Sequence, residues 1–272
     1  MQFGPDAARY WLAGDGQRLA RPFNLRWLLP AVCGQDIRRW WAVWALSWPV
    51  AAAGCSWWAH GSGAPWGVSV AVAALLLTLP GILGPAVSRP VGVDLPGLAL
   101  GLIAAGCYAN GQPVIGTVVV LLAANVRETV PVAVALWSWS PLPLVGLIVP
   151  AAVALVRRSE LDPVTAQPLL RHVHEHPFRS ALEHHRGMWR DAWEMVAPWG
   201  ATLSALGEVT PQLVLTLLMA HAPLAFSTDN VRITQPLAGP VMAFAAAQVF
   251  PPHWLPLVVI LHAVWWRPPT LI

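Results

Sequence analysis

Charged residues are scarce in this sequence of 272 residues. Only 11% of the residues are Asp, Glu, Lys or Arg, whereas 56% are hydrophobic, and the mean hydropathy is +0.55. Soluble globular domains carry about 25% charged residues. Because the shortage extends along most of the chain, the composition argues against a soluble domain and predicts a polytopic membrane protein.

Lysine is absent, so all 16 basic residues are arginine. Together with the abundance of Ala, Pro, Gly and Trp, this absence indicates codon bias in a GC-rich genome rather than a functional requirement. The net charge is only +3. It fits the excess of basic residues in the cytoplasmic loops of membrane proteins better than the basic surface that nucleic-acid binding requires. We therefore expect no nucleic acid among the partners.

Cysteine is also scarce, and Cys33, Cys55 and Cys107 show no C-x-x-C spacing. We expect small buried residues at these positions rather than a disulfide or a metal site. A Walker loop, a G-x-S-x-G elbow, an H-E-x-x-H pair and a dinucleotide fingerprint are absent from the sequence. Residues 1–30 lack the apolar core of a signal peptide, so the first spanning segment is expected to serve as the insertion signal.

Long apolar runs, in contrast, are numerous. Crossing the hydrocarbon core of a bilayer takes roughly 20 residues of α-helix. Candidate segments are 40–59, 67–87, 95–109, 113–138, 141–157, 194–206, 210–226, 233–250 and 252–266. Several are short and many contain proline, which kinks a helix within a membrane. The pattern predicts an all-α fold, a polytopic transmembrane bundle with about 8–10 short or broken spanning helices.

Tryptophan is abundant, with 17 residues, and many lie at the ends of the apolar segments. This placement is typical of the aromatic belt at a membrane interface. The predicted organisation is an amphipathic or interfacial N-terminal segment (1–39), transmembrane helices (40–157), a polar His/Arg-rich loop with an interfacial helix (158–193) and further transmembrane helices (194–272). The arginines of the loop predict that it is cytoplasmic, in a multi-pass protein of a bacterial-type cytoplasmic membrane.

Arg127 and Glu128 interrupt the apolar segment 113–138. Arg38-Arg39 and Arg157-Arg158 flank the first transmembrane region. If both pairs lie on the cytoplasmic side, the chain between them crosses the membrane an even number of times. This holds when 113–138 forms two half-helices that meet at the charged pair. The alternative is one continuous helix with a buried ion pair that faces the bundle interior. The pair either ends a helix at the interface, or Arg127 is an anion clamp in a site for a phosphate or sugar.

Asp229 and Arg232 lie in the stretch S-T-D-N-V-R at 227–232. Their i, i+3 spacing allows them to pair on one helical turn, and Asp229 also suits an N-cap of the helix that follows. Capping does not explain Arg232, because the helix dipole disfavours a cation at that end. Arg232 is therefore predicted to have an acidic partner or an anionic ligand.

The N-terminal stretch G-P-D-A-A-R-Y-W-L-A-G-D-G places Asp6, Arg9 and Tyr10 on roughly one face of a helix. Pro5 suits the first turn of that helix. The stretch is either an amphipathic surface helix or part of a site. In the second case Asp6 is a general base or a carboxylate that anchors a metal.

Histidines form two groups. The first lies in the polar loop (His172, His174, His176, His184 and His185), and the second lies in or beside apolar segments (His60, His221, His253 and His262). We expect the first group to be solvated rather than metal-binding, because alternating histidines converge only in an extended segment. The second group is interpreted as hydrogen-bonded interfacial residues, with haem ligation as the alternative.

Three sequence elements carry a resemblance. They are D-A-A-R-Y-W-L-A-G at 6–14 followed by P-F-N-L-R-W-L-L-P at 22–30, V-R-E-T-V-P at 126–131, and T-D-N-V-R at 228–232. In this order they resemble the first acidic loop, the basic-Glu-Thr element and the Asp-x-x-Arg step of the C-type superfamily of polytopic membrane glycosyltransferases. These enzymes take a sugar from a polyprenyl-phosphate donor.

The resemblance implies that Asp6 is the catalytic acid of the first loop or a ligand of a divalent metal ion. The implied substrate-binding residues are Tyr10, Arg26, Arg127, Glu128, Asp229 and Arg232. The implied partners are membrane lipid, a polyprenyl-phosphate sugar, an envelope acceptor and, for a reduced member, other membrane subunits.

Two further classes of function are left open by the sequence. The arginine count places Asp6 on the cytoplasmic side, whereas the family's chemistry is extracytoplasmic, so a non-catalytic scaffold or subunit of a larger complex is one alternative. The other is a small transporter in which Glu128 and Asp229 carry protons or ions at broken helices.

Overall fold

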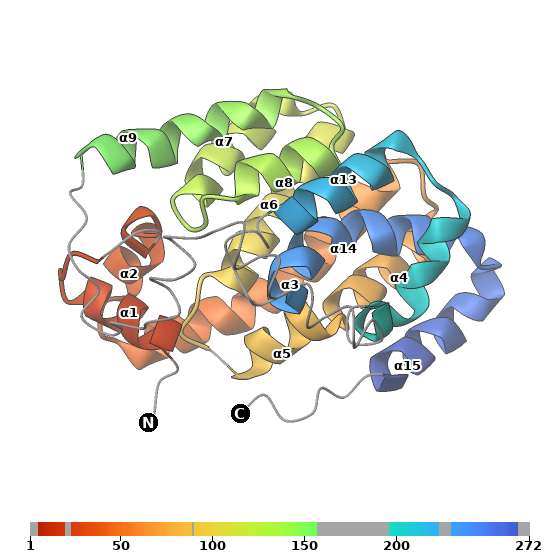
Figure 1. Ribbon diagram of the computed structural model, residues 1–272, viewed down its shortest axis with the longest axis horizontal. Coiled ribbons are helices and arrows are strands. Elements are labelled where there is room, and N and C mark those ends of the chain that lie inside the picture. Colours follow the sequence, from red (N-terminus) through yellow and green to blue (C-terminus); the bar gives the residue numbers. More distant parts are fainter. Residues whose placement is uncertain (1–4, 20–22, 89, 157–195, 223–229, 266–272) are drawn as a thin grey trace. The chain divides into compact units, whose positions relative to one another are not determined.

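The computed structural model describes residues 5–19, 23–88, 90–156, 196–222 and 230–265, and every regular element in these ranges is a helix (Figure 1). The prediction of an all-α fold is confirmed. In chain order the α-helices and 3-10 helices (η) are α1 (Pro5–Gly14), η1 (Phe23–Leu25), α2 (Leu28–Cys33), α3 (Ile37–Gly61), α4 (Trp66–Leu77), α5 (Pro80–Ser88), α6 (Asp94–Ala109), α7 (Pro113–Ala124), α8 (Val130–Trp137), η2 (Leu142–Leu147), α9 (Ile148–Val156), η3 (Ala197–Gly207), α13 (Pro211–His221), α14 (Asn230–Val249), η5 (Pro252–Trp254) and α15 (Leu255–Trp265).

The apolar segment 113–138 is broken into α7 and α8 by the residues that carry the charges. The Arg127 N–H donates to the Ala123 carbonyl and the Val130 N–H donates to the Arg127 carbonyl, so residues 125–129 form tight turns. Pro131, in the first turn of α8, has no N–H to donate and is suited to a helix start. The prediction of two short helices is confirmed, and the alternative of one continuous helix is wrong.

Length and apolar composition bear on the predicted spans. Among the described helices, none combines enough length with enough apolar character to cross a bilayer alone. Two pairs of helices are long and apolar enough only when both members of the pair are counted together. They are Trp66–Leu77 with Pro80–Val87, bent by 63°, and Thr234–Val249 with Pro252–Val264, bent by 116°. The transmembrane bundle and its number of spans therefore stay a prediction.

The chain folds into two compact units. The first comprises Met1–Gly63 and Ala86–Thr165, and the second comprises Ala64–Pro85 and Ala166–Ile272. The chain passes from one unit to the other three times, and the second passage, between Pro85 and Ala86, falls within α5. The predicted polar loop, with its five histidines and its interfacial helix, lies outside the described residues.

Helices α3 and α6 form the centre of the first unit through close contacts at glycines. A Cβ atom on Gly54 would lie 2.9 Å from the backbone nitrogen of Ile103, and one on Gly106 would lie 2.6 Å from the Trp57 ring. Small residues allow two helix backbones to approach closely enough for extensive van der Waals contact. The two helices are therefore packed through surfaces that tolerate no added methyl group.

A separate apolar cluster fixes the N-terminal helices of this unit. It includes the buried side chains of Tyr10, Cys33, Trp40 and Val126. The Trp40 Nε1–H donates to the Gly34 carbonyl at 3.1 Å, which ties the start of α3 to the end of α2. All three cysteines of the chain are free and buried, as the sequence predicts.

In the second unit a buried amide on α14 connects three segments. Gln235 is fully buried; its Oε1 accepts from the Gly81 N–H at 2.6 Å, and its Nε2 donates to the Pro198 carbonyl at 2.9 Å. A Cβ on Gly239 would lie 2.8 Å from the Leu76 side chain, so α14 and α4 also pack closely. Because both the oxygen and the nitrogen of this buried amide are hydrogen-bonded, the side chain favours one arrangement of these three segments.

We expect Gly54→Ala to destabilise the protein by about 1–3 kcal/mol, because the atom nearest to the added methyl group is a backbone atom of α6, which cannot move aside as the end of a side chain can. Gly67→Ala is the matched control, because a Cβ at Gly67 has no neighbour within 4 Å and alanine favours the helix. Thermal unfolding in detergent measures both. A Gly54→Ala protein as stable as the wild type would contradict the close contact.

Candidate functional site

The candidate site is a charged cluster in the first unit, defined by Asp6, Arg9, Tyr10, Arg26, Asp94, Arg127 and Glu128. It joins three parts of the chain that are distant in sequence. Helix α1 and the segment after η1 supply the N-terminal residues, the first turn of α6 supplies an acid, and the break between α7 and α8 supplies the last two.

The centre of the cluster is a bidentate ion pair between Arg26 and Glu128. Arg26 Nε donates to Glu128 Oε2 at 2.7 Å, and Arg26 Nη2 donates to Glu128 Oε1 at 2.6 Å. Arg26 Nη1 donates to the Tyr10 hydroxyl at 2.8 Å. The two side chains of the pair are only 13% and 18% exposed, so a low-dielectric environment strengthens these bonds.

The Phe23 ring lies under two cations of this cluster. The Arg9 guanidinium carbon is 4.5 Å from the ring centroid and that of Arg26 is 5.6 Å away. Tyr10 meets the same ring edge-to-face at 5.6 Å. The negative face of an aromatic ring attracts guanidinium groups, so Phe23 stabilises both arginines of the cluster.

Two further ion pairs complete the cluster. Arg9 Nη1 donates to Asp6 Oδ1 at 3.1 Å across one turn of α1, and Arg127 Nη1 donates to Asp94 Oδ1 at 2.5 Å. A Cβ on Gly97 would lie 3.0 Å from the Arg127 Cβ, so α6 closely approaches the arginine stem one turn beyond Asp94. Each carboxylate of the cluster is thus bonded by an arginine of the cluster.

Burial and pairing set the protonation states at the centre. Burial raises the pKa of Tyr10 to about 12, so the phenol stays protonated at neutral pH. Burial opposes ionisation of Glu128, but attraction to Arg26 and the hydrogen bonds from it outweigh this effect and lower the pKa of Glu128. Burial also opposes the charge on Arg26, yet attraction to Tyr10 and Glu128 raises its pKa well above the ordinary value.

The structure brings together five of the residues that the sequence assigns to a site: Asp6, Tyr10, Arg26, Arg127 and Glu128. The predicted site residue Asp229 lies outside the described residues. Arg232 belongs to α14, and its side chain lies outside the described part as well.

Phe23 and Asp94 were not predicted as site residues. Phe23 stands inside the quoted element P-F-N-L-R, but no spacing marks it as a support for two arginines. Asp94 precedes an apolar run in V-G-V-D-L-P. A search for an acid able to neutralise Arg127 would have included it, but pairing across 33 residues leaves no periodic signal in the sequence.

The metal-binding role predicted for Asp6 stays a prediction, and the described residues offer it little support. They contain no group of three or more His, Cys, Asp or Glu side chains able to hold a metal ion. The guanidinium of Arg9 also lies directly against the Asp6 carboxylate, where its positive charge disfavours a bound cation.

Three of the four histidines of the apolar regions, His221, His253 and His262, belong to the second unit and make local contacts there. His221 Nδ1 bonds to the Leu217 carbonyl at 2.7 Å, and His262 Nδ1 accepts from the Ala201 N–H at 3.2 Å. His253 meets Trp254 in a tilted ring contact. The hydrogen bonds of His221 and His262 agree with the interpretation of hydrogen-bonded histidines, while Nε2 of the buried His262 has no hydrogen-bond partner. The interfacial location stays a prediction.

Comparisons with protein-family models, with curated proteins and with solved structures find no match to this chain.

Glu128→Gln is expected to destabilise the protein by about 3 kcal/mol, because it leaves the Arg26 charge buried without its counter-ion. The double variant Arg26→Met with Glu128→Leu should be more stable than Glu128→Gln, since neither charge remains. Glu208→Gln, at an exposed glutamate, is the control and should have no effect. Denaturant unfolding measures all three, and a double variant no more stable than Glu128→Gln would contradict the coupling.

The same carboxyl predicts an acid-dependent loss of stability. Because the pKa of Glu128 is lower in the folded chain than its ordinary value of 4.5, ionised Glu128 stabilises the fold above that pH. This stabilisation is lost as the pH falls below 4.5 and through the folded pKa. Thermal unfolding between neutral and acidic pH should show a steeper loss for the wild type than for Glu128→Gln. Parallel curves would contradict the assignment.

Proposed function

We propose that this chain is a multi-pass membrane protein of the glycosyltransferase type, which moves a sugar from a polyprenyl-phosphate donor to an envelope acceptor. The observation that carries the proposal is the meeting of two elements that resemble the C-type superfamily. The first-loop residues Tyr10 and Arg26 bond each other, and Arg26 bonds Glu128 of the V-R-E-T element. Elements of one active site are expected to converge in this way although 102 residues separate them.

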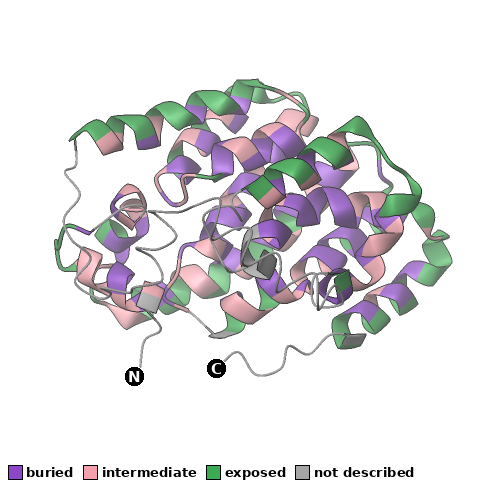
Figure 2. Ribbon diagram, in the orientation of Figure 1, coloured by how far each residue is buried: buried purple, intermediate pink, exposed green. Residues whose placement is uncertain are grey.

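The membrane location is supported by the apolar side chains that the helices leave exposed. On α7, Val114 is 76% exposed and Val118 is 53% exposed, and on α9, Leu155 is 88% exposed. Figure 2 shows exposed residues over much of α9 and α15. Monomeric soluble proteins rarely expose large contiguous apolar patches, so lipid is the simplest environment for these helices.

The proposed chemistry is a displacement at the anomeric carbon of the donor sugar. The acceptor hydroxyl oxygen forms a bond to that carbon, and Asp6 takes the hydroxyl proton. The bond between the anomeric carbon and the phosphate oxygen breaks, and its electron pair stays on the phosphate. Arg127 stabilises the departing phosphate by charge-assisted hydrogen bonds.

Arg26 adds a second candidate for contact with the phosphate. Each of its terminal nitrogens carries a second N–H besides the one bonded to Tyr10 or Glu128. The guanidinium can therefore donate to an anion while its present bonds hold it in place. This makes Arg26 a pre-organised donor rather than a mobile one.

A non-catalytic scaffold is the second candidate function, and a specific observation favours it. The acids Asp6, Asp94 and Glu128 are each already bonded by an arginine of the cluster. A self-compensated cluster stabilises one arrangement of helices without needing a ligand. The two functions differ in what happens when Asp6 loses its charge.

The catalytic proposal predicts that Asp6→Asn lowers transfer from a polyprenyl-phosphate sugar by about 10²-fold or more, because an amide does not accept the acceptor's proton. Its oxygen still accepts from Arg9, so the fold should be retained. Asp15→Asn, at an exposed aspartate next to α1, is the matched control and should keep full activity. The measurement is radiolabelled sugar transfer in membranes, alongside thermal unfolding. Undiminished transfer by a folded Asp6→Asn protein would refute the catalytic role.

Spin labels test the membrane location. In a background with the three native cysteines replaced by alanine, a label at Val118→Cys on α7 should be accessible to oxygen and shielded from a water-soluble nickel chelate. A label at Gln35→Cys, an exposed position between α2 and α3, should show the opposite preference. Power-saturation EPR in reconstituted vesicles gives both values. Equal access of nickel to both labels would refute a lipid-facing α7.

A further inference from the structure

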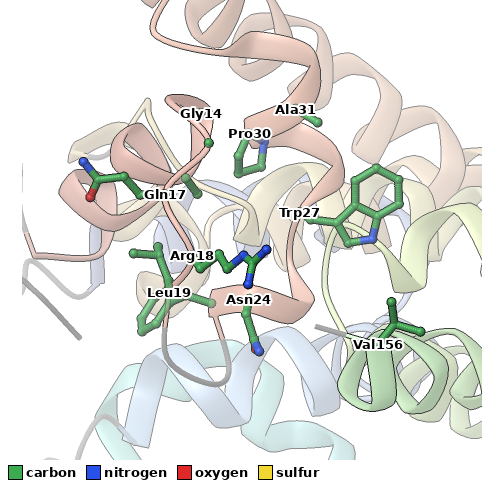
Figure 3. Close-up of a pocket in the computed structure, with 12 residues that line it drawn as sticks. Gly14, Gln17, Arg18, Leu19, Asn24, Trp27, Pro30, Ala31 and Val156 are labelled. Carbon is green, nitrogen blue, oxygen red and sulfur yellow. The ribbon is translucent and has the colours of Figure 1, made fainter. Parts of the chain in front are cut away.

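A pocket of about 680 Å³ in the first unit is lined by the end of α1, the residues that follow it, η1 and α2 (Figure 3). Both polar atoms of the Asn24 side chain are enclosed by protein. The polar side chains that a ligand would meet are therefore Gln17 and Arg18, which are exposed. Two exposed side chains do not define a ligand. Buried polar side chains that bond across helices lie instead in the second unit.

Helix η3 of the second unit is bent at Gly200. This residue has φ 49° and ψ −130°, a backbone conformation that residues with a side chain rarely adopt. The bend divides η3 into a first arm, 197–199, and a second arm, 201–207. The Thr202 hydroxyl donates to the Trp199 carbonyl at 2.6 Å, so the arms stay linked across the bend. Glycine allows the backbone to pivot at this point, which suits a hinge.

Each arm is held by a buried side chain from a different helix. Nε2 of Gln235 on α14 donates to the Pro198 carbonyl at 2.9 Å and holds the first arm. Nδ1 of His262 on α15 accepts from the Ala201 N–H at 3.2 Å and holds the second arm. A carboxamide does not titrate, whereas an imidazole ordinarily gains a proton at about pH 6.5. The two anchors therefore differ in their response to acid.

The hydrogen bond from Ala201 requires a neutral His262. Nδ1 accepts this bond with its lone pair, so the ring proton of the neutral form is on Nε2. A proton added to Nδ1 would occupy the lone pair and place two N–H groups against each other. The second arm would then lose its anchor, while the first arm would keep its bond to Gln235.

The surroundings of His262 do not compensate an added charge. The residue is 4% exposed, and its Nε2 has no hydrogen-bond partner. Of the elements that pack against α15 within the described ranges, α4 and η3 carry no titratable or charged side chain. Helix η5 carries the exposed His253, and the C-cap of η3 is the exposed Glu208. A buried charge without a partner is unfavourable, so a protonated His262 is more stable outside this contact.

We infer that η3 contains an acid-sensitive switch, in which Gly200 is the hinge and His262 is the clamp. Near neutral pH the clamp is closed, because neutral His262 accepts from Ala201. Below about pH 6.5 the imidazole is protonated, the bond is lost and the second arm leaves α15. The first arm stays on Gln235, so the chain pivots at Gly200. The released form binds one proton more than the clamped form, and a fall in pH therefore favours release.

Hydrogen–deuterium exchange of the full-length protein in detergent, resolved at single amides, tests the switch. Protection of the Ala201 amide should fall about tenfold or more between about pH 7.5 and about pH 5, after correction for the intrinsic exchange rate. The Leu213 amide is the matched control, because it donates to the Thr210 hydroxyl at 3.1 Å and this acceptor does not titrate. Both pH values lie above 4.5, so protonation of Glu128 does not contribute.

Two substitutions separate the acceptor from the titration. In His262→Asn, the side-chain oxygen can replace Nδ1 as the acceptor and does not titrate. The Ala201 amide should therefore stay protected at both pH values. In His262→Phe, a ring remains but the acceptor is removed, so the same amide should be weakly protected at both pH values.

Three results would overturn the inference. One is a wild-type Ala201 amide whose protection does not change with pH, or changes only as much as that of Leu213, and this comparison needs no variant to fold. Another is the same pH response in wild type and His262→Asn, which would assign the response to a different group. The third is a parallel loss of protection at Gly81, whose N–H donates to Gln235, because the anchor of the first arm would then have moved as well.

Discussion

The ion pair between Arg26 and Glu128 constrains the whole N-terminal part of the first unit. Both side chains are largely buried, and a charge buried without its partner costs several kcal/mol. The segment that carries Arg26 must therefore lie where the break between α7 and α8 presents Glu128. The positions of Tyr10 and Phe23 are constrained in turn, because each side chain contacts the Arg26 guanidinium. The position of α1 is thus determined by an acid more than one hundred residues further along the chain.

The break itself depends on backbone chemistry that the charges alone would not provide. Pro131 is compatible with the first turn of α8 and not with the middle of a longer helix. Asn125 stabilises the end of α7, since its Nδ2 donates to the Leu121 carbonyl at 2.8 Å. Between these two residues the chain turns, and Arg127 and Glu128 extend from the turn toward different acid–base partners. A polar site is built here by interrupting an apolar helix.

The elements that a single sequence predicts well here are those with a local signal. The helices follow the apolar segments, and the division of 113–138 follows from two charges and a proline. The sequence has no such local signal for which charged or aromatic side chains contact one another. The contact of Arg127 with Asp94, and the use of Phe23 by two arginines, depend on tertiary packing between distant segments.

The separation of Arg26 from Glu128 along the chain also has a consequence for biogenesis. During synthesis Arg26 emerges first, and its partner Glu128 follows 102 residues later, which takes on the order of 5–20 s at about 5–20 residues per second. Throughout that interval the guanidinium is more stable in water than in an apolar core. The N-terminal segment is therefore the first part of the unit to be made and among the last to dock, so the order of assembly differs from the order of translation.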